Sequence, residues 1–135
     1  MDKVTIRIEA EVNPTESEEK VKKAVWNLFG EIPVETKLAQ KGITLTAENT
    51  GQEPLITFRN LLHRDHIRDA SRKALYQGLK TGTLTVYLNK QVAFAGHVSF
   101  SEPEAESPLG SIIVTILSED PVQLIDWLAP RTTKA

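Results

Sequence analysis

Six basic side chains in this sequence could bind the phosphates of an RNA backbone. They are Arg59, Arg64, Arg68, Arg72, Lys73 and Lys90. Arg64, Arg68 and Arg72 recur every four residues, and on a helix this spacing would place the three guanidinium groups along one ridge. Asp65 and Asp69 are spaced to pair with the same arginines, so an ion-paired, solvated helix face also explains the pattern. We favour the ion-paired face and keep RNA binding by the ridge as an alternative.

The distribution of charge argues against a general nucleic-acid binder. The formal net charge is −2, although the segment 59–80 contains six basic and two acidic residues. One basic helical region therefore lies on an otherwise acidic molecule. Domains that bind nucleic acids without sequence preference are usually strongly basic, so tight, non-specific binding to RNA or DNA is not expected.

His63 and His66 lie one helical turn apart and raise the question of a metal site. Asp69 or His97 could supply a third ligand, but no spacing fixes it, and the neighbouring arginines would repel a divalent cation. We predict no metal, no cofactor, and histidines with a structural or surface role.

Motifs for catalysis are missing from the sequence. It contains no paired nucleophile and base, no phosphate-binding loop and no dinucleotide fingerprint. We therefore predict a non-catalytic binding or assembly module and not an enzyme. An enzyme whose small-molecule pocket is assembled only by folding stays open as a second alternative.

Alternation and helix signals predict a strand followed by a helix at the start of the chain. Apolar and polar residues alternate over 3–12, as in a strand with one buried face. Thr15 and Glu18 have the spacing of a capping box, and Gly30 is a suitable helix end. The buried stripe of this helix is predicted to be Val21, Ala24, Val25, Leu28 and Phe29.

The next segments predict a hairpin and a broken helix. Alternation over 43–47 indicates a strand, with 34–38 as a short edge partner. Helical spacing runs over 55–79, with a break near His63 or Arg64. Further on, 111–117 has apolar residues on both faces, as in an interior strand covered on each side. Asp120 and Pro121 then suit a helix start, and Pro130 ends that helix.

We interpret the segment 83–100 as a β-hairpin that supplies two central strands. A three-residue loop at 89–91 would place the apolar residues of both strands on one face, whereas a two-residue turn would leave both faces to be covered and would favour a partner chain. In the preferred register Phe94 and Phe100 belong to the core and are not platforms for base stacking. Lys90 would lie at the hairpin tip.

Several runs together resemble a known family. They are IRIEAEVNPTE near the start, FRNLLHRDHIRDASRKAL in the middle, YLNKQVAFAG in the hairpin, and IDWLAP near the end. In this order they resemble an archaeal family of proteins of unknown function, over almost the whole chain. Its fold is similar to that of the ribosomal large-subunit protein that binds 5S ribosomal RNA, and to the RNA-recognition-motif class. The resemblance implies an antiparallel sheet of about five strands with helices packed against it, and a homodimer. It implies no catalytic residues.

The elements fit one α+β domain over 1–130, with a frayed tail over 131–135. An acidic surface loop is expected over 101–108. The chain has no cysteine, which favours a reducing compartment, and its alternating N-terminus is neither a signal peptide nor a membrane anchor. We expect a cytoplasmic protein that does not bind membranes. Its partners would be a second copy, an unknown protein or RNA, and Trp26, Trp127 and the strand 111–117 are candidates for the subunit interface.

Overall fold

The computed structural model describes residues 4–40, 42–101 and 110–131. The strands in these residues are β1 (Val4–Val12), β2 (Glu35–Ala39), β3 (Gly42–Thr50), β4 (Leu79–Lys80), β5 (Thr83–Asn89) and β6 (Ser111–Ser118). The helices are α1 (Glu18–Phe29), α2 (Glu53–Arg64), α3 (Arg68–Gln77), α4 (Lys90–Phe94) and α5 (Pro121–Leu128).

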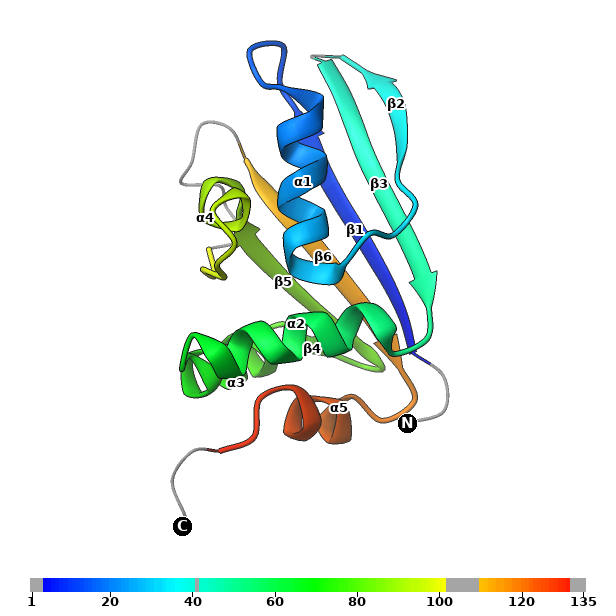
Figure 1. The fold of residues 1–135 in the computed structure, drawn as a ribbon. Helices are drawn as coiled ribbons and strands as arrows, with labels where there is room; N and C mark the ends of the chain where they lie inside the picture. Colours follow the sequence, from blue (N-terminus) through cyan, green and yellow to red (C-terminus); the bar gives the residue numbers. More distant parts are fainter. Residues whose placement is uncertain (1–3, 41, 102–109, 132–135) are drawn as a thin grey trace.

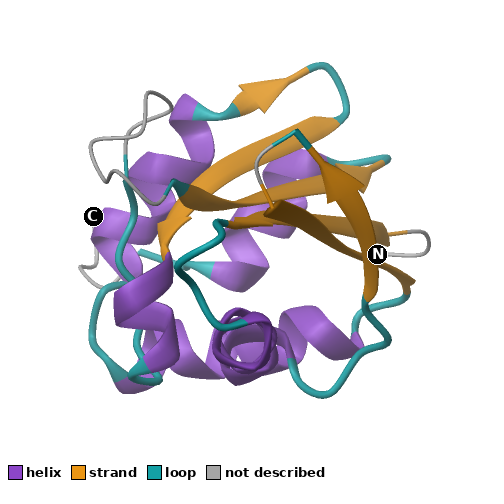
Figure 2. Ribbon diagram, turned by 90° about the horizontal axis from the view of Figure 1, so that it is seen from above, coloured by secondary structure: helices purple, strands orange, loops and turns teal. Residues whose placement is uncertain are grey.

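The strands form one antiparallel sheet in the order β2-β3-β1-β6-β5-β4. Helix α1 lies along one face of this sheet, and α2 crosses the same side (Figures 1 and 2). The predicted α+β class is therefore confirmed, with six strands in the described residues where about five were expected.

β1 lies inside the sheet because its sequence can bury one face completely. Val4, Ile6, Ile8, Ala10 and Val12 are buried beneath the helices, and the residues between them point to the other face. Ile8 pairs with Ala47 of β3 on one side and with Val114 of β6 on the other. The predicted first strand is confirmed over the described residues.

β6 is an interior strand, as predicted, but helices cover only one of its faces in the described part of the chain. Ile112, Val114 and Ile116 are fully buried, whereas Ile113 and Leu117 on the opposite face are half-buried. The prediction of cover on both faces is therefore wrong. The apolar residues on both faces of β6 reflect its central position between β1 and β5 in the sheet. They do not indicate a second layer of helices.

The start of α1 differs from the predicted capping box. Ser17 is the cap, and its hydroxyl accepts a hydrogen bond from the backbone N–H of Lys20 at 3.4 Å. The Glu16 carboxylate turns back to accept hydrogen bonds from Asn13, so the helix begins two residues later than Thr15 would allow. The predicted buried stripe of α1 and its end at Gly30 are confirmed.

The broken helix in the middle of the chain is confirmed. α2 ends at Arg64 and α3 begins at Arg68, with His66 between them at a φ of 57°. The predicted pair of strands before it is also present, as the hairpin of β2 and β3. Phe29 of α1 stacks on Phe58 of α2, with ring centroids 5.0 Å apart, and this contact lies in the core.

The predicted hairpin over 83–100 is wrong in its second half. β5 is a strand, but the chain then forms the short helix α4. Asn89 caps this helix by accepting a hydrogen bond from the N–H of Val92 at 2.9 Å, and Gly96 follows it at a φ of 90°. These helix start and stop signals outweigh the apparent alternation of Val92, Phe94 and Val98. In the sheet β5 lies between β6 and β4, and the chain returns to it after α4 in an antiparallel bridge of Phe100 with Leu88.

The end of the described chain follows the prediction. α5 begins at Pro121, and the Asp120 carboxylate accepts a hydrogen bond from the N–H of Gln123 at 3.0 Å. Most of the predicted loop over 101–108, and the tail beyond residue 131, lie outside the described residues. No described helix has the length and apolar character needed to cross a lipid bilayer.

Candidate nucleic-acid interface

The predicted arginine ridge is not a continuous feature of one helix. Arg64 is the last residue of α2, whereas Arg68 and Arg72 belong to α3. A turn that contains Asp65 and His66 separates the two helices. The three arginines therefore do not lie along the axis of one helix. Each basic side chain therefore has its own environment.

Arg59 and Arg72 bind the end of α5. The Arg59 Nε donates to the carbonyl of Trp127 at 2.8 Å, and its guanidinium lies over the Trp127 ring at 5.3 Å. Arg72 donates to the carbonyl of Ala129 at 3.3 Å and pairs with Asp126 at 2.7 Å. Two cations at the C-terminus of a helix donate hydrogen bonds to its free carbonyls and interact favourably with the negative end of the helix dipole. Both arginines thus dock the last helix on the domain.

Arg64 connects the turn after α2 with the loop after α4. Its Nε donates to Asp65 at 2.9 Å, and its Nη2 donates to the carbonyl of Gly96 at 2.7 Å. His97 Nδ1 lies 3.1 Å from the second oxygen of Asp65. The hydrogen bond from Arg64, and then that from His97, lower the pKa of Asp65 despite its partial burial. The Arg64 side chain is still 54% exposed and accessible to a ligand.

Lys90 does not lie at a hairpin tip. Its side chain is only 5% exposed, and its ammonium donates to the carbonyl of Glu11 at 2.7 Å and to the Glu16 carboxylate at 2.9 Å. The Lys90 ammonium is therefore bound within the protein. Of the six predicted residues, Arg64 and Lys73 are exposed and Arg68 is half-buried.

Sequence reasoning missed a second cationic surface, formed by α1 and α4. Lys20 and Lys23 of α1 have their ammonium groups 5.8 and 5.9 Å from the centre of the Phe94 ring. Lys22 lies 4.8 Å from the centre of the Trp26 ring. Phe94 is 41% exposed, so its prediction as a core residue is wrong. Asn89 and Gly96, read as the cap and the stop of a helix, were the signals that could have revealed this surface.

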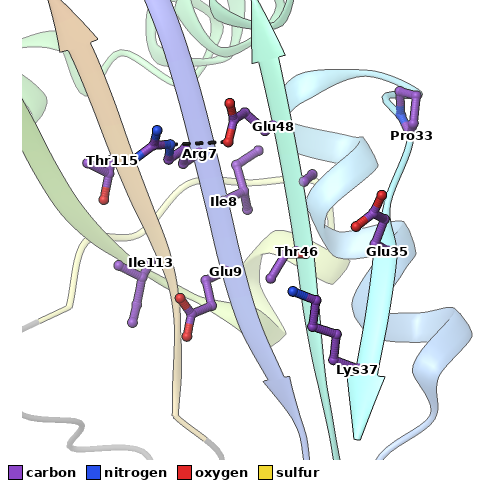
Figure 3. Close-up of a pocket in the computed structure, with 11 residues that line it drawn as sticks. Arg7, Ile8, Glu9, Pro33, Glu35, Lys37, Thr46, Glu48, Ile113 and Thr115 are labelled. Carbon is purple, nitrogen blue, oxygen red and sulfur yellow. Dashed lines mark hydrogen bonds and ion pairs between the residues drawn. The ribbon is translucent and has the colours of Figure 1, made fainter.

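The sheet face turned away from α1 contains a shallow cavity of about 570 Å³ over β1, β2, β3 and β6 (Figure 3). Arg7 and Glu48 form an ion pair of 3.1 Å across β1 and β3. Glu9, Glu35 and Lys37 point into the same area. The lining has more carboxylates than cations, and it includes no histidine. With three carboxylates and two cations, this lining offers no excess of positive charge to a phosphate group.

The described residues do not gather metal ligands around the histidines. Within the described residues no group of three metal-ligating side chains lies together. Burial lowers the pKa of His63, and the charges of Arg59 and Arg68 lower it further. Its Nε2 is buried without a hydrogen-bond partner. These surroundings favour the neutral form of the His63 side chain, although a hydrogen bond with the Leu128 backbone acts in the opposite direction.

Comparison with known proteins identifies relatives along almost the whole chain. A family model described as RNA binding matches residues 5–117. A UPF0201 protein from Sulfurisphaera tokodaii is 43% identical over 129 residues, which cover 96% of this chain and 89% of the relative. One from Thermococcus kodakarensis is 40% identical over 127 residues, which cover 94% of this chain and 90% of the relative.

Solved structures show the same fold. The crystal structure of a UPF0201 protein from Methanococcus jannaschii has a TM-score of 0.83 and 32% identity, and the match covers 93% of this chain and 99% of that one. A DUF54 protein from Methanothermobacter thermautotrophicus, at 19% identity, shares the fold with a TM-score of 0.66 and coverage of 95% and 99%. None of these descriptions indicates a catalytic function. This chain belongs to the archaeal UPF0201 family, whose model is described as RNA binding.

Proposed function

We propose that this protein is a non-catalytic RNA-binding module that contacts RNA with cations on its helices and not with the open face of its sheet. The observation that carries the proposal is the difference in charge balance between the two. On the open face the exposed carboxylates of Glu9, Glu11, Glu35 and Glu48 outnumber the exposed cations Arg7 and Lys37. On α1, the end of α2 and α3, the exposed cations Lys20, Lys23, Arg64 and Lys73 outnumber the exposed carboxylates Glu19 and Asp69.

The open face also lacks the aromatic side chains that RNA-recognition sheets use for base stacking. Tyr87 is the one aromatic residue in the six described strands, and it is half-buried. Single-stranded RNA is normally bound on such sheets by two or three stacked bases. An acidic face with one partly covered ring supports neither the phosphate contacts nor the stacking.

Helix-borne cations are better placed for phosphates. Arg64 and Lys73 are exposed, and Arg68 is half-buried at the start of α3. On α1, Lys20 and Lys23 are exposed as well. These two groups are the surfaces on which we expect the RNA backbone to lie. The non-catalytic part of the proposal is supported by the open cavity of Figure 3, whose Arg7 and Glu48 are both more than half exposed to water.

A salt series with two matched double variants tests this function. RNA affinity is measured by fluorescence anisotropy for the native protein, for Arg64→Gln/Lys73→Gln, and for the sheet-face control Arg7→Gln/Lys37→Gln. Each variant removes two positive charges. The helix variant is expected to bind more weakly, with a salt slope smaller by about 0.7 for each phosphate that it no longer neutralises, and the control to bind like the native protein. No RNA binding at low salt, or a weaker affinity in the control than in the helix variant, would disprove the proposal.

A homodimer is a second proposal, and it is favoured by the edge strand β2. All five residues of β2 are exposed, and Leu38 is 92% exposed. Antiparallel pairing of β2 with its own copy about Thr36 would place Glu35 opposite Lys37 of the second copy, and Val34 opposite Leu38. Opposite charges and apolar pairs across neighbouring strands are both favourable.

Sedimentation analysis of the native protein and of a Leu38→Glu variant tests the dimer. The native protein is expected to sediment as a dimer at concentrations where the variant is a monomer. Because Leu38 is almost fully exposed within the chain, the substitution should leave the fold of each subunit intact, which circular dichroism checks. A native protein that stays monomeric at high concentration would refute the pairing.

A further inference from the structure

We propose that Phe94, between Lys20 and Lys23, is a stacking site for an unpaired base, so that the RNA bound here is single-stranded. This inference rests on the RNA-binding function proposed above and specifies the class of RNA. The site lies on α1 and α4. Of the six RNA-binding residues predicted from the sequence, only Lys90 belongs to these helices.

Helix α4 is held firmly enough to present a ring in a fixed position. At its start, the buried Lys90 ties it to Glu11 and Glu16. At its end, the side-chain amide of Asn27 on α1 donates to the carbonyls of Ala93 and Phe94 at 3.0 and 3.1 Å. Ala93 is buried beneath the helix. These contacts leave the Phe94 ring outside the core, beside α1.

Two hollows in the surface have Phe94 in their linings. One cavity, of about 520 Å³, is lined by Phe94, Trp26, Asn27 and three lysines of α1, and also by the carboxylates Glu19 and Glu31. The other, of about 430 Å³, is lined by Thr15, Gln91 and Phe94. Lys20 lines both cavities. Cavities of about 300–1,000 Å³ hold small organic ligands, and each hollow is therefore large enough for one base.

The two lysines complete the site because they are available to phosphates. Lys22 pairs with Glu19 at 3.7 Å and lies over Trp26, so its charge is partly used within α1. Lys20 and Lys23 form no side-chain ion pair with another described residue and lie over Phe94. A base stacked on the ring would bring its flanking phosphates toward these ammonium groups. Aromatic rings framed by cations are the common elements of single-strand binding surfaces.

Single-stranded RNA is the occupant that these elements select. Bases inside a duplex are already stacked and paired, and side chains cannot read the narrow major groove of an RNA helix. The Phe94 ring on α4 could therefore reach a base only in a loop, at an end or in an unpaired strand. Because every base has a π-face, we expect little sequence preference.

Fluorescence anisotropy with a short labelled polyuridine strand, and with a duplex of equal length, tests the site. Phe94→Ala and Phe94→Leu are expected to weaken binding of the single strand about tenfold, with an unchanged salt slope. Phe94→Trp is expected to bind the single strand as tightly as the native protein does. Lys20→Gln/Lys23→Gln should lower the salt slope by about 0.7 for each phosphate that is no longer neutralised. Duplex binding should not respond to the Phe94 variants.

The outcomes separate this inference from the function on which it rests. A native protein that binds neither RNA overturns both. Native binding that all Phe94 variants retain overturns the stacking site alone and leaves the ring as a contact for a protein partner. Tyr87→Leu is the control, because Tyr87 is a half-buried ring on the open face of the sheet, where the proposed function places no RNA. An equal weakening in Tyr87→Leu would contradict the assignment to Phe94. Thermal unfolding of each variant shows whether the fold is retained.

Discussion

Lys90 and Glu16 form an ion pair of 2.9 Å that joins α4 to the turn before α1, with side chains only 5% and 12% exposed. Lys90 also donates to the carbonyl of Glu11, and Glu16 accepts from both the backbone and the side-chain amide of Asn13. Every charged group here has a hydrogen-bonding partner. Removing one partner would leave the other as an uncompensated charge.

Replacing Lys90 by Met is therefore expected to lower the free energy of unfolding by about 3–5 kcal/mol. The double variant Lys90→Met/Glu16→Gln should be destabilised less, because glutamine keeps an acceptor for Asn13 and carries no buried charge. Urea unfolding of the native protein, both single variants and the double variant measures this coupling. Additive effects of the two substitutions would show that the side chains do not interact.

Stability should fall in acid partly through Glu16. Burial by itself raises the pKa of this carboxyl, but hydrogen bonds from Asn13 and Lys90 outweigh it, and the net shift lowers the pKa. The unfolded chain then binds a proton at a higher pH than the folded chain, so the contribution is complete above the ordinary glutamate range and is lost as pH falls through the lower, folded pKa. Urea unfolding of the native protein and Glu16→Gln across this range should show a difference that narrows in acid. A difference independent of pH would contradict this assignment.

Arg72 is predicted to stabilise the fold through α5. Arg72→Gln removes the charged hydrogen bond to the Ala129 carbonyl and should lower the free energy of unfolding by about 1.5–3 kcal/mol. The pair with Asp126 should add little, because Asp126 is 57% exposed. Urea unfolding measures the change, and Lys73→Gln, at an exposed neighbour, is the control. Equal stability of the two variants would mean that the guanidinium does not hold α5.

Asn27 is predicted to position α4. Asn27→Ala removes the two hydrogen bonds to the carbonyls at the end of α4 and should reduce stability by about 1–2 kcal/mol. If Phe94 stacks with a base, the same change should weaken binding to single-stranded RNA, since the ring no longer has a fixed position. Asn60→Ala, at an exposed position on α2, is the control for both measurements. Unchanged hydrogen exchange of the α4 amides in Asn27→Ala would contradict the positioning role.

Long periodic segments were predicted well because local chemistry and burial agree in them. The alternation of β1, the stripe of α1, the break between α2 and α3, and the cap of α5 at Asp120 were all found in the sequence and are present in the structure. The resemblance to an archaeal family was confirmed by comparison. Each of these features depends on residues close together in the chain.

The segment after β5 was mispredicted because it is too short for periodicity to decide. Val92, Phe94 and Val98 alternate like a strand, yet a cap at Asn89, contacts from Lys90 and the amide of Asn27 select a helix. Lys90 was predicted at the surface for the same reason. Its partners lie 79 and 74 residues away in the chain, and no spacing in the sequence points to them.

The candidate site was also predictable only in part. Composition and nearest neighbours are enough to predict the α+β class, the order of most elements, and the presence of cations with helical spacing. Which of those cations are free depends instead on how distant elements pack. Packing directs Arg59, Arg72 and Lys90 to carbonyls and a carboxylate on other elements, and it brings Lys20 and Lys23 to Phe94, because contacts between distant segments are fixed by the fold and not by spacing along the chain.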